Sequence, residues 1–177
     1  MDHLMEKTIE KKVLFQGQVI TLRLDKVRLP NGKEASREVV THPGAACVVP
    51  LTDQGEVILV RQWRHPLERL SLEIPAGKLS VGEDPLLCAQ RELAEETGFQ
   101  AMEWHHLFSY YASPGFCNEK IHIYKAYHLI PSEARPDEDE FIESLTMPLD
   151  EALEKIQSGE IFDGKTITAL IEVARQK

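Results

Sequence analysis

The segment from Gly77 to Phe99, GKLSVGEDPLLCAQRELAEETGF, constrains the fold most, because it carries its own start and stop signals. Asp84 can cap a helix whose first position suits Pro85. Gly98 can end that helix in the left-handed conformation that glycine tolerates. The spacing therefore predicts a helix over residues 84–97, entered from a glycine turn. One stripe of this helix, which we expect to pack on a sheet, comprises Leu86, Ala89, Gln90, Leu93 and Thr97.

Strand signals dominate the sequence before and after this helix. Apolar and polar residues alternate over residues 13–41 around Asn31-Gly32, a strong hairpin signal, which predicts two or three antiparallel strands. Further strands are expected over residues 45–51, 56–64, 70–77, 104–113 and 120–130, and helices over 149–159 and 164–176. This order predicts an α/β or α+β domain with a mixed β-sheet.

Carboxylates crowd the face of the helix next to the apolar stripe. Glu92 and Glu96 are four residues apart and lie side by side, and Arg91 can pair with Glu95 at the same spacing. Like charges at that spacing cost roughly 0.2–0.5 kcal/mol. Acids near the C-terminal end of a helix also oppose its dipole. A solvated acidic face with one ion pair is one interpretation. The uncompensated repulsion favours a ligand, and clustered oxygens suit a hard divalent cation such as Mg²⁺ or Mn²⁺.

The charge balance and the cysteines limit the classes of partner. The formal net charge of −9 argues against broad binding to nucleic acid or to a membrane surface, which needs a basic footprint. The three cysteines are widely spaced, which fits free thiols in a reducing compartment. The first residues lack the apolar core of a signal peptide, and no apolar run is long enough for a membrane span. We therefore expect a cytoplasmic protein with a small-molecule partner.

The acid-rich segment resembles the Nudix box, a motif with many defined positions in 23 residues. The matching positions are Gly77, Glu83, Arg91, Glu92, Leu93, Glu95, Glu96, Gly98 and Phe99. Nudix hydrolases cleave a nucleoside diphosphate linked to another group, using divalent metals. The resemblance implies a Nudix fold, a mixed β-sheet sandwiched between helices with an N-terminal antiparallel β-arm. It also implies that Glu92 and Glu96 are the core metal ligands, joined by the main-chain carbonyl of Ala76.

The other box residues receive supporting roles from the same resemblance. Glu95 is implied to be a further metal ligand or a support for one. Glu83 is implied to pair with Arg91 or to reach a metal through water. Arg91 would then orient Glu95 and offset its charge. Gly77 would let the backbone turn close beside the metals.

Segments outside the box are similar to the ADP-ribose pyrophosphatase subgroup. Pro114, sixteen residues after Gly98, stands at the spacing typical of this subgroup, although Pro-Gly is also a common turn dipeptide. In VRQWRHP, Arg64 is implied to bind a phosphate. In LEIPAG, Glu73 is implied to contact the metal site or the substrate. In SPGFCNEKI, Glu119 is implied to contact the terminal ribose.

The acidic segment ARPDEDEFIE, residues 134–143, resembles the mobile catalytic loop of the subgroup, although a polar turn is the alternative. We expect Glu138 to be the general base and Glu140 a metal ligand, and the order of these two roles stays open. The implied reaction is Mg²⁺-dependent hydrolysis of ADP-ribose to AMP and ribose 5-phosphate. Alternatives are another nucleoside diphosphate derivative, such as a nucleotide sugar or NADH, and a non-catalytic ADP-ribose-binding module.

The N-terminal strands are expected to form an arm separate from the catalytic domain. The resemblance implies that residues 1–42 are exchanged between the subunits of a homodimer, and that residues 43–177 form the Nudix catalytic domain. Arg37, in ASREVV, could stack on adenine as a planar cation. It could equally be an edge-strand charge that discourages aggregation.

Overall fold

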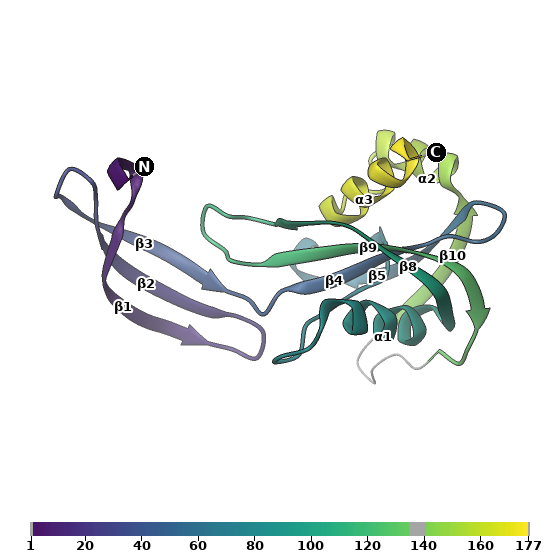
Figure 1. Cartoon of the computed structure of the whole chain (residues 1–177), viewed down its shortest axis with the longest axis horizontal. Coiled ribbons are helices and arrows are strands. Elements are labelled where there is room, and N and C mark those ends of the chain that lie inside the picture. The colour runs from purple at the N-terminus through teal and green to yellow at the C-terminus, as the bar shows by residue number, and fades with distance from the viewer. Residues whose placement is uncertain (1, 135–140, 177) are drawn as a thin grey trace. The chain divides into compact units, whose positions relative to one another are not determined.

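Strands are the predominant secondary structure, as the alternating patterns predict (Figure 1). The computed structural model describes residues 2–134 and 141–176. The chain divides into two units, which we call unit 1 (Met1–Gly44 with Tyr110–Lys120) and unit 2 (Ala45–Ser109 with Ile121–Lys177). The sequence-based division after residue 42 did not include the second segment of unit 1.

Unit 1 is built on a three-stranded antiparallel sheet in the order β1-β2-β3. Its strands are β1 (Lys7–Gln16), β2 (Thr21–Arg28) and β3 (Glu34–Thr41). The β2–β3 hairpin turns at the predicted Asn31-Gly32, where Gly32 has φ 83°. The end of β3 is also held by the second segment of unit 1, because the Val40 N–H donates to the Phe116 carbonyl at 2.8 Å. The predicted arm is therefore confirmed as an antiparallel sheet, with its first strand starting earlier than expected.

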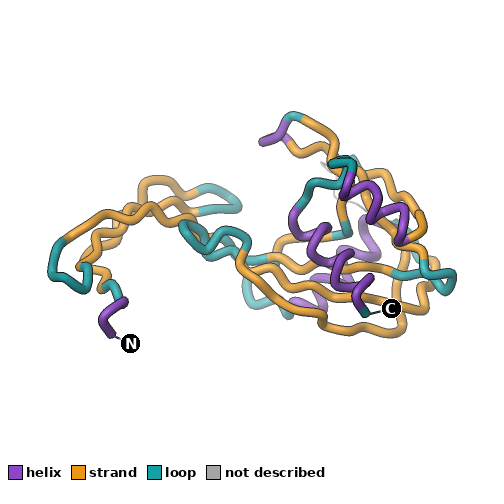
Figure 2. Tube along the Cα trace, turned by 90° about the horizontal axis from the view of Figure 1, so that it is seen from above, coloured by secondary structure: helices purple, strands orange, loops and turns teal. Residues whose placement is uncertain are grey.

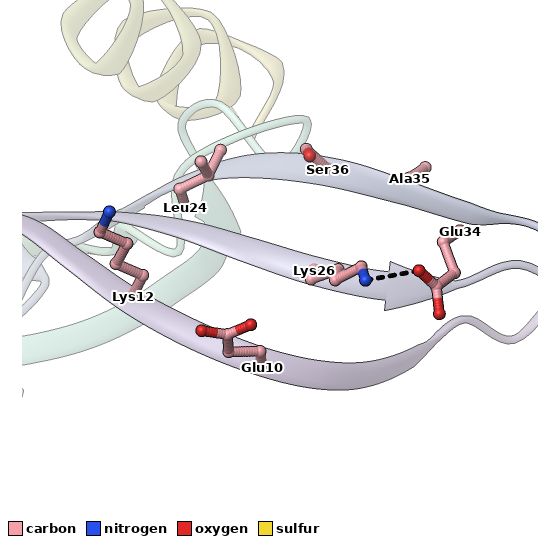
Figure 3. Close-up of a pocket in the computed structure, with 7 residues that line it drawn as sticks. All are labelled: Glu10, Lys12, Leu24, Lys26, Glu34, Ala35 and Ser36. Carbon is pink, nitrogen blue, oxygen red and sulfur yellow. Dashed lines mark ion pairs between the residues drawn. The ribbon is translucent and has the colours of Figure 1, made fainter.

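The sheet of unit 1 carries a pocket of about 300 Å³ (Figure 3). Lys26 and Glu34 form an ion pair of 2.5 Å at its edge. The lining residues are Glu10, Lys12, Leu24, Lys26, Glu34, Ala35 and Ser36. None of them is a predicted site residue, and their mixed charges balance within the pocket.

Unit 2 contains a mixed sheet in the order β7-β4-β9-β8. The strand β4 (Ala45–Pro50) runs parallel to β9 (Lys120–Pro131) and antiparallel to β7 (Ala76–Lys78). The strand β8 (Phe99–Tyr111) forms one edge of this sheet, and β7 forms the other. A second, antiparallel sheet has the order β10-β5-β6, with β10 (Ile142–Pro148), β5 (Glu56–Arg64) and β6 (Arg69–Glu73).

Helices cover both faces of the mixed sheet, as predicted (Figures 1 and 2). The helix α1 (Pro85–Thr97) lies on one side, and α2 (Leu149–Gln157) and α3 (Gly164–Arg175) lie on the other. Two residues of the predicted stripe, Ala89 and Leu93, are fully buried against Ala46 and Val48 of β4. This packing fixes α1 on the sheet beside β7.

The structure differs from the predicted strands in three further places. The expected strand over residues 70–77 is two strands, because the chain bends at Ile74-Pro75 and proline has no N–H to donate to a sheet. The strand β8 starts directly after α1, and β10 was not expected at all. In the described part of the chain, no helix is both long and apolar enough to cross a membrane.

Candidate active site

The ends of α1 follow the predicted capping chemistry. The Asp84 carboxylate accepts hydrogen bonds from the Leu86 N–H at 2.8 Å and the Leu87 N–H at 3.3 Å. Pro85 occupies the first helical position, and Gly98 ends the helix with φ 71°. These local signals place the acid-rich face of α1 next to β7.

Two of the predicted metal ligands lie against the backbone of β7. Glu92 and Glu96 are only 7% and 6% exposed. A Cβ atom on Gly77 would lie 1.6 Å from Oε1 of Glu92, so only glycine leaves room for this carboxylate. The Ala76 N–H donates to Oε2 of Glu96 at 3.1 Å. The structure thus brings Ala76, Gly77, Glu92 and Glu96 together.

Arg91 lies at the centre of the remaining box acids. Its Nη1 donates to Glu95 at 2.9 Å and to Glu92 at 2.7 Å, and its Nε donates to Glu83 at 3.2 Å. Burial disfavours the charged guanidinium, but the hydrogen bonds and charges of these acids raise the Arg91 pKa above its ordinary value. The pairs with Glu95 and Glu83 were predicted, whereas the contact with Glu92 was not.

Glu83 is also fixed by the turn before α1. The Ser80 N–H donates to its Oε2 at 2.8 Å. This backbone hydrogen bond, followed by the pairing with Arg91, lowers the Glu83 pKa. Glu83 is therefore held in its ionised form, beside Arg91 and just before α1.

The acid-rich face has the donor chemistry of a divalent-cation site. Carboxylate and carbonyl oxygens suit Mg²⁺ or Mn²⁺, and Mg²⁺ typically takes only one or two protein carboxylates and completes its shell with water and phosphate oxygens. Within residues 2–134 and 141–176, no three metal-ligating side chains are gathered closely enough to hold an ion by themselves. Glu92 and Glu96, with the Ala76 carbonyl, fit such an open site and could hold a divalent ion.

A second charged cluster joins two other predicted residues, Arg64 and Glu73. The Arg64 Nε donates to Oε1 of Glu73 at 2.8 Å, and its Nη2 donates to Oε2 at 2.6 Å. Lys165 also pairs with Oε2 of Glu73. Burial, with Glu73 1% exposed, opposes ionisation, but the bonds to these two cations lower the Glu73 pKa to about 2.

The sequence analysis missed the part of this cluster that comes from α3. The Lys165 Nζ lies 2.9 Å from Oδ2 of Asp163, the residue that caps α3. Thr166 donates its hydroxyl proton to the same oxygen at 2.6 Å and accepts the Ile74 N–H at 3.0 Å. One signal was present, because a lysine in the first turn of a helix opposes the helix dipole.

Two of the predicted substrate contacts, Pro114 and Glu119, belong to unit 1. Pro114 lies in a turn closed by the Phe116 N–H, which donates to the Ser113 carbonyl at 3.1 Å. Oε1 of Glu119 lies 3.6 Å from Nδ1 of His42. Their contacts with substrate stay predictions.

The remaining predicted site residues lie in unit 1 or outside the described residues. Arg37 donates from Nε to Oε2 of Glu6 at 3.1 Å and from Nη1 to the Ser36 carbonyl at 2.9 Å. Its stacking on adenine stays a prediction. Glu138 and Glu140 lie outside the described residues.

Comparison with known protein families shows which family the chain belongs to. The NUDIX domain family matches residues 40–170, which include the whole acid-rich segment. The chain belongs to the Nudix family. A second family, the nucleoside diphosphate sugar hydrolase N-terminal domain, matches residues 6–40 of this Nudix protein.

Two curated relatives of this Nudix protein are similar over nearly their whole length. An ADP-ribose pyrophosphatase from Bacillus subtilis (strain 168) is 47% identical over 172 residues, covering 96% of this chain and 93% of the relative. A methanol dehydrogenase activator from Bacillus methanolicus is 47% identical over 167 residues, covering 93% of this chain and 90% of the relative.

A solved structure has the same fold as this Nudix protein. The crystal structure of an ADP compounds hydrolase superposes with a TM-score of 0.88, covering 98% of this chain and 95% of that chain. Because the two sequences are 24% identical, this likeness shows the fold alone.

Proposed function

We propose that this Nudix protein hydrolyses the pyrophosphate of ADP-ribose to AMP and ribose 5-phosphate. The observation that carries the substrate is the 47% identity to the Bacillus subtilis ADP-ribose pyrophosphatase, which extends over 96% of this chain. The geometry supports the chemistry, because the buried carboxylate of Glu92 lies against Gly77 and that of Glu96 accepts the Ala76 N–H, both on the edge strand β7.

Each part of unit 2 has a distinct role in this proposal. Glu92, Glu96 and the Ala76 carbonyl would hold the divalent ion, which we take to be Mg²⁺, with Mn²⁺ as a substitute. A divalent ion bound there supplies charge neutralisation at the pyrophosphate and polarises the attacking water. Arg91 holds Glu95 and Glu92 in place, and Arg64 offers a fixed positive charge to a phosphate.

The general base is proposed to come from the acidic segment before β10. Glu138 takes the water proton and Glu140 binds metal in this assignment. Glu138→Gln and Glu140→Gln, each compared by turnover and by Mg²⁺ titration, test it. The variant that loses turnover but keeps metal affinity identifies the base, and normal turnover in both would reject the assignment.

A substrate panel tests the proposed reaction. The purified protein, with Mg²⁺ at slightly alkaline pH, is offered ADP-ribose, GDP-mannose, NADH and an ADP-sugar, and release of the nucleoside monophosphate is measured. We expect ADP-ribose to have the highest kcat/KM. A panel in which ADP-ribose is poorly cleaved would reject the substrate, and no cleavage at all would support a binding module.

A nucleotide sugar is the second candidate substrate. The match of residues 6–40 to the nucleoside diphosphate sugar hydrolase N-terminal domain favours it. Both substrates share the pyrophosphate that the box would act on, so they differ only in the group beyond it. The ratio of kcat/KM for ADP-ribose and GDP-mannose in the panel separates them.

We also propose a homodimer in which the N-terminal strands of residues 1–42 are exchanged between subunits. Exposed apolar side chains of β1 support it, since Ile9, Val13 and Phe15 are 44%, 55% and 57% exposed in the single chain. Arg37 and Glu119 would then contribute to substrate binding, with Pro114 shaping the loop. Sedimentation equilibrium tests the dimer, and a monomer at micromolar concentration would reject it.

The cytoplasm is the proposed compartment. All three cysteines are free thiols, and Cys47 and Cys88 are buried. Burial raises the Cys88 pKa to about 12, which keeps the thiol protonated and inert. Fractionation of the native cells, followed by activity measurement, tests this location.

A further inference from the structure

The charged cluster around Glu73 places one buried carboxylate between two cations. Glu73 is the most deeply buried member, with 2% of its side chain exposed. Lys165, which lies beside Asp163, has 12% of its side chain exposed. Arg64 is the most exposed of the three, with 39% of its side chain exposed. The two cations therefore hold one carboxylate between them.

The hydrogen bonds of Arg64 use only part of its guanidinium, and its side chain is 39% exposed. Nε and Nη2 are both used by Glu73. Among the described residues, Nη1 makes no hydrogen bond, so its N–H groups can meet a ligand. A guanidinium held by two bonds to one carboxylate is fixed in plane, which suits recognition of a phosphate.

The carboxylate of Glu73 is itself fixed by α3. Lys165 binds its Oε2, and Thr166 binds the N–H of the next residue, Ile74. Asp163 contacts both Lys165 and Thr166, so the first turn of α3 acts as one brace. If Lys165 lost its charge, Glu73 would keep Arg64 as its only cation among the described residues, and no positive charge would lie between buried Glu73 and partly exposed Asp163.

We propose that Lys165 is a positioning residue for substrate binding, which acts by fixing Glu73 and, through it, the phosphate-facing guanidinium of Arg64. This inference rests on the proposed function for the identity of the ligand, ADP-ribose. In this arrangement Glu73 is a support for Arg64, because both of its oxygens are already bonded to cations.

A double-mutant cycle between Lys165→Met and Arg64→Ala tests the inference. The affinity for ADP-ribose is measured by calorimetry with a chelator present, so that no turnover occurs, and kcat and KM are then measured with Mg²⁺. Lys165→Met should weaken binding by about tenfold, in line with loss of a charged hydrogen-bond partner. The loss should appear mainly in KM. In the Arg64→Ala background it should have almost no further effect.

The matched control is Lys155→Met in α2. Lys155 also contacts two carboxylates, Glu160 at 2.9 Å and Glu151 at 3.7 Å, but these belong to α2 and the residues after it. This variant should bind and cleave ADP-ribose as the unmodified protein does. If Lys165→Met does not fold, Lys165→Gln, which keeps an N–H donor for Glu73, carries the same cycle.

The outcomes separate this inference from the proposed function. Losses that add in the double variant would show that Lys165 does not act through Arg64, and would overturn the inference even if ADP-ribose is cleaved. Unchanged affinity in Lys165→Met or Lys165→Gln would overturn it too. If the unmodified protein binds ADP-ribose without cleaving it and the losses do not add, the proposed reaction fails and the inference holds.

Discussion

Two charged clusters of unit 2 use buried carboxylates in opposite ways. In the acid-rich segment, which carries four box glutamates, the guanidinium of Arg91 pairs with three: Glu83 before α1, and Glu92 and Glu95 on α1. At the start of α3, Glu73 and Asp163 share two cations, Arg64 and Lys165. The first cluster carries an excess of negative charge, and the second is balanced.

The difference shows which cluster needs a ligand to be complete. A balanced buried cluster can be satisfied by the chain alone, and its function is to fix geometry. A cluster with excess negative charge keeps a local repulsion that a divalent ion would relieve. The proposed metal site is therefore the cluster in which carboxylates outnumber the nearby cations.

Neutralising an acid in the unbalanced cluster should have the largest effect. Glu96→Gln keeps the shape of the side chain but removes the charge of a proposed metal ligand, so turnover should fall by about a thousandfold or more. Release of AMP from ADP-ribose measures the rate, and circular dichroism checks that the fold is intact. Glu154→Gln, on the exposed face of α2, is the control. A near-normal rate for Glu96→Gln would reject the assignment of Glu96 as a metal ligand.

Replacing a glycine beside each cluster by alanine should have the next largest effect, and the effect should differ between the two clusters. The Cβ of Gly77→Ala would meet Oε1 of Glu92 at 1.6 Å and must displace that carboxylate. We expect a loss of about 1–3 kcal/mol in the free energy of unfolding, with turnover reduced by about a hundredfold. Gly164→Ala, with nothing within 4 Å of its Cβ, should change neither quantity. Equal effects of the two substitutions on turnover would contradict the close approach of Glu92 to Gly77.

Acid should weaken the balanced cluster. The Glu73 pKa is lowered from 4.5 to about 2, so its ionised form stabilises the fold fully above pH 4.5 and this contribution is lost as pH falls toward 2. The contribution is on the order of 3 kcal/mol. Urea unfolding of the unmodified protein and Glu73→Gln, from pH 6 down to 2, measures it. The two free energies should converge over this range, and a constant difference would refute the assignment.

Removing the helix caps should give the smallest effects, and the two caps should differ in their effects on stability and KM. Asp84 only caps α1, so Asp84→Ala should cost about 1 kcal/mol of the free energy of unfolding and leave KM unchanged. Asp163 caps α3 and also pairs with Lys165, so Asp163→Ala should cost about 2–3 kcal/mol and raise KM. Thermal unfolding and steady-state kinetics measure both. The comparison would fail if Asp84→Ala had the larger effect on KM.

Local signals made the acid-rich cluster predictable. The caps Asp84 and Gly98, the spacing of Glu92 and Glu96 and the hairpin at Asn31-Gly32 all act within a few residues of each other. The contact between Arg91 and Glu92 was not predictable, because neighbouring residues of a helix do not normally face each other. In the structure, the Glu92 oxygen that lies beside Gly77 is the one that accepts the hydrogen bond from Arg91.

The balanced cluster could not be predicted from the sequence, because its members lie far apart along the chain. Lys165 and Glu73 are separated by 92 residues, so no local pattern links them. At the break between β6 and β7, the Ile74 N–H donates to the Thr166 hydroxyl, which comes from the same distant turn. Because no local pattern shows this bond, the sequence predicted one continuous strand there. The strand β10 comes soon after an acidic segment whose composition predicts a polar loop and not the start of a strand.

The brace at the start of α3 also sets an order of events during synthesis. Glu73 leaves the ribosome 92 residues before the lysine that neutralises it. At about 5–20 residues per second, that interval is roughly 5–18 s. During this time Lys165 is not yet available to Glu73, and the Thr166 hydroxyl is not yet available to the Ile74 N–H. The cluster around Glu73 can therefore be completed only after the acid-rich helix has been synthesised, whose caps Asp84 and Gly98 lie within one stretch of 23 residues.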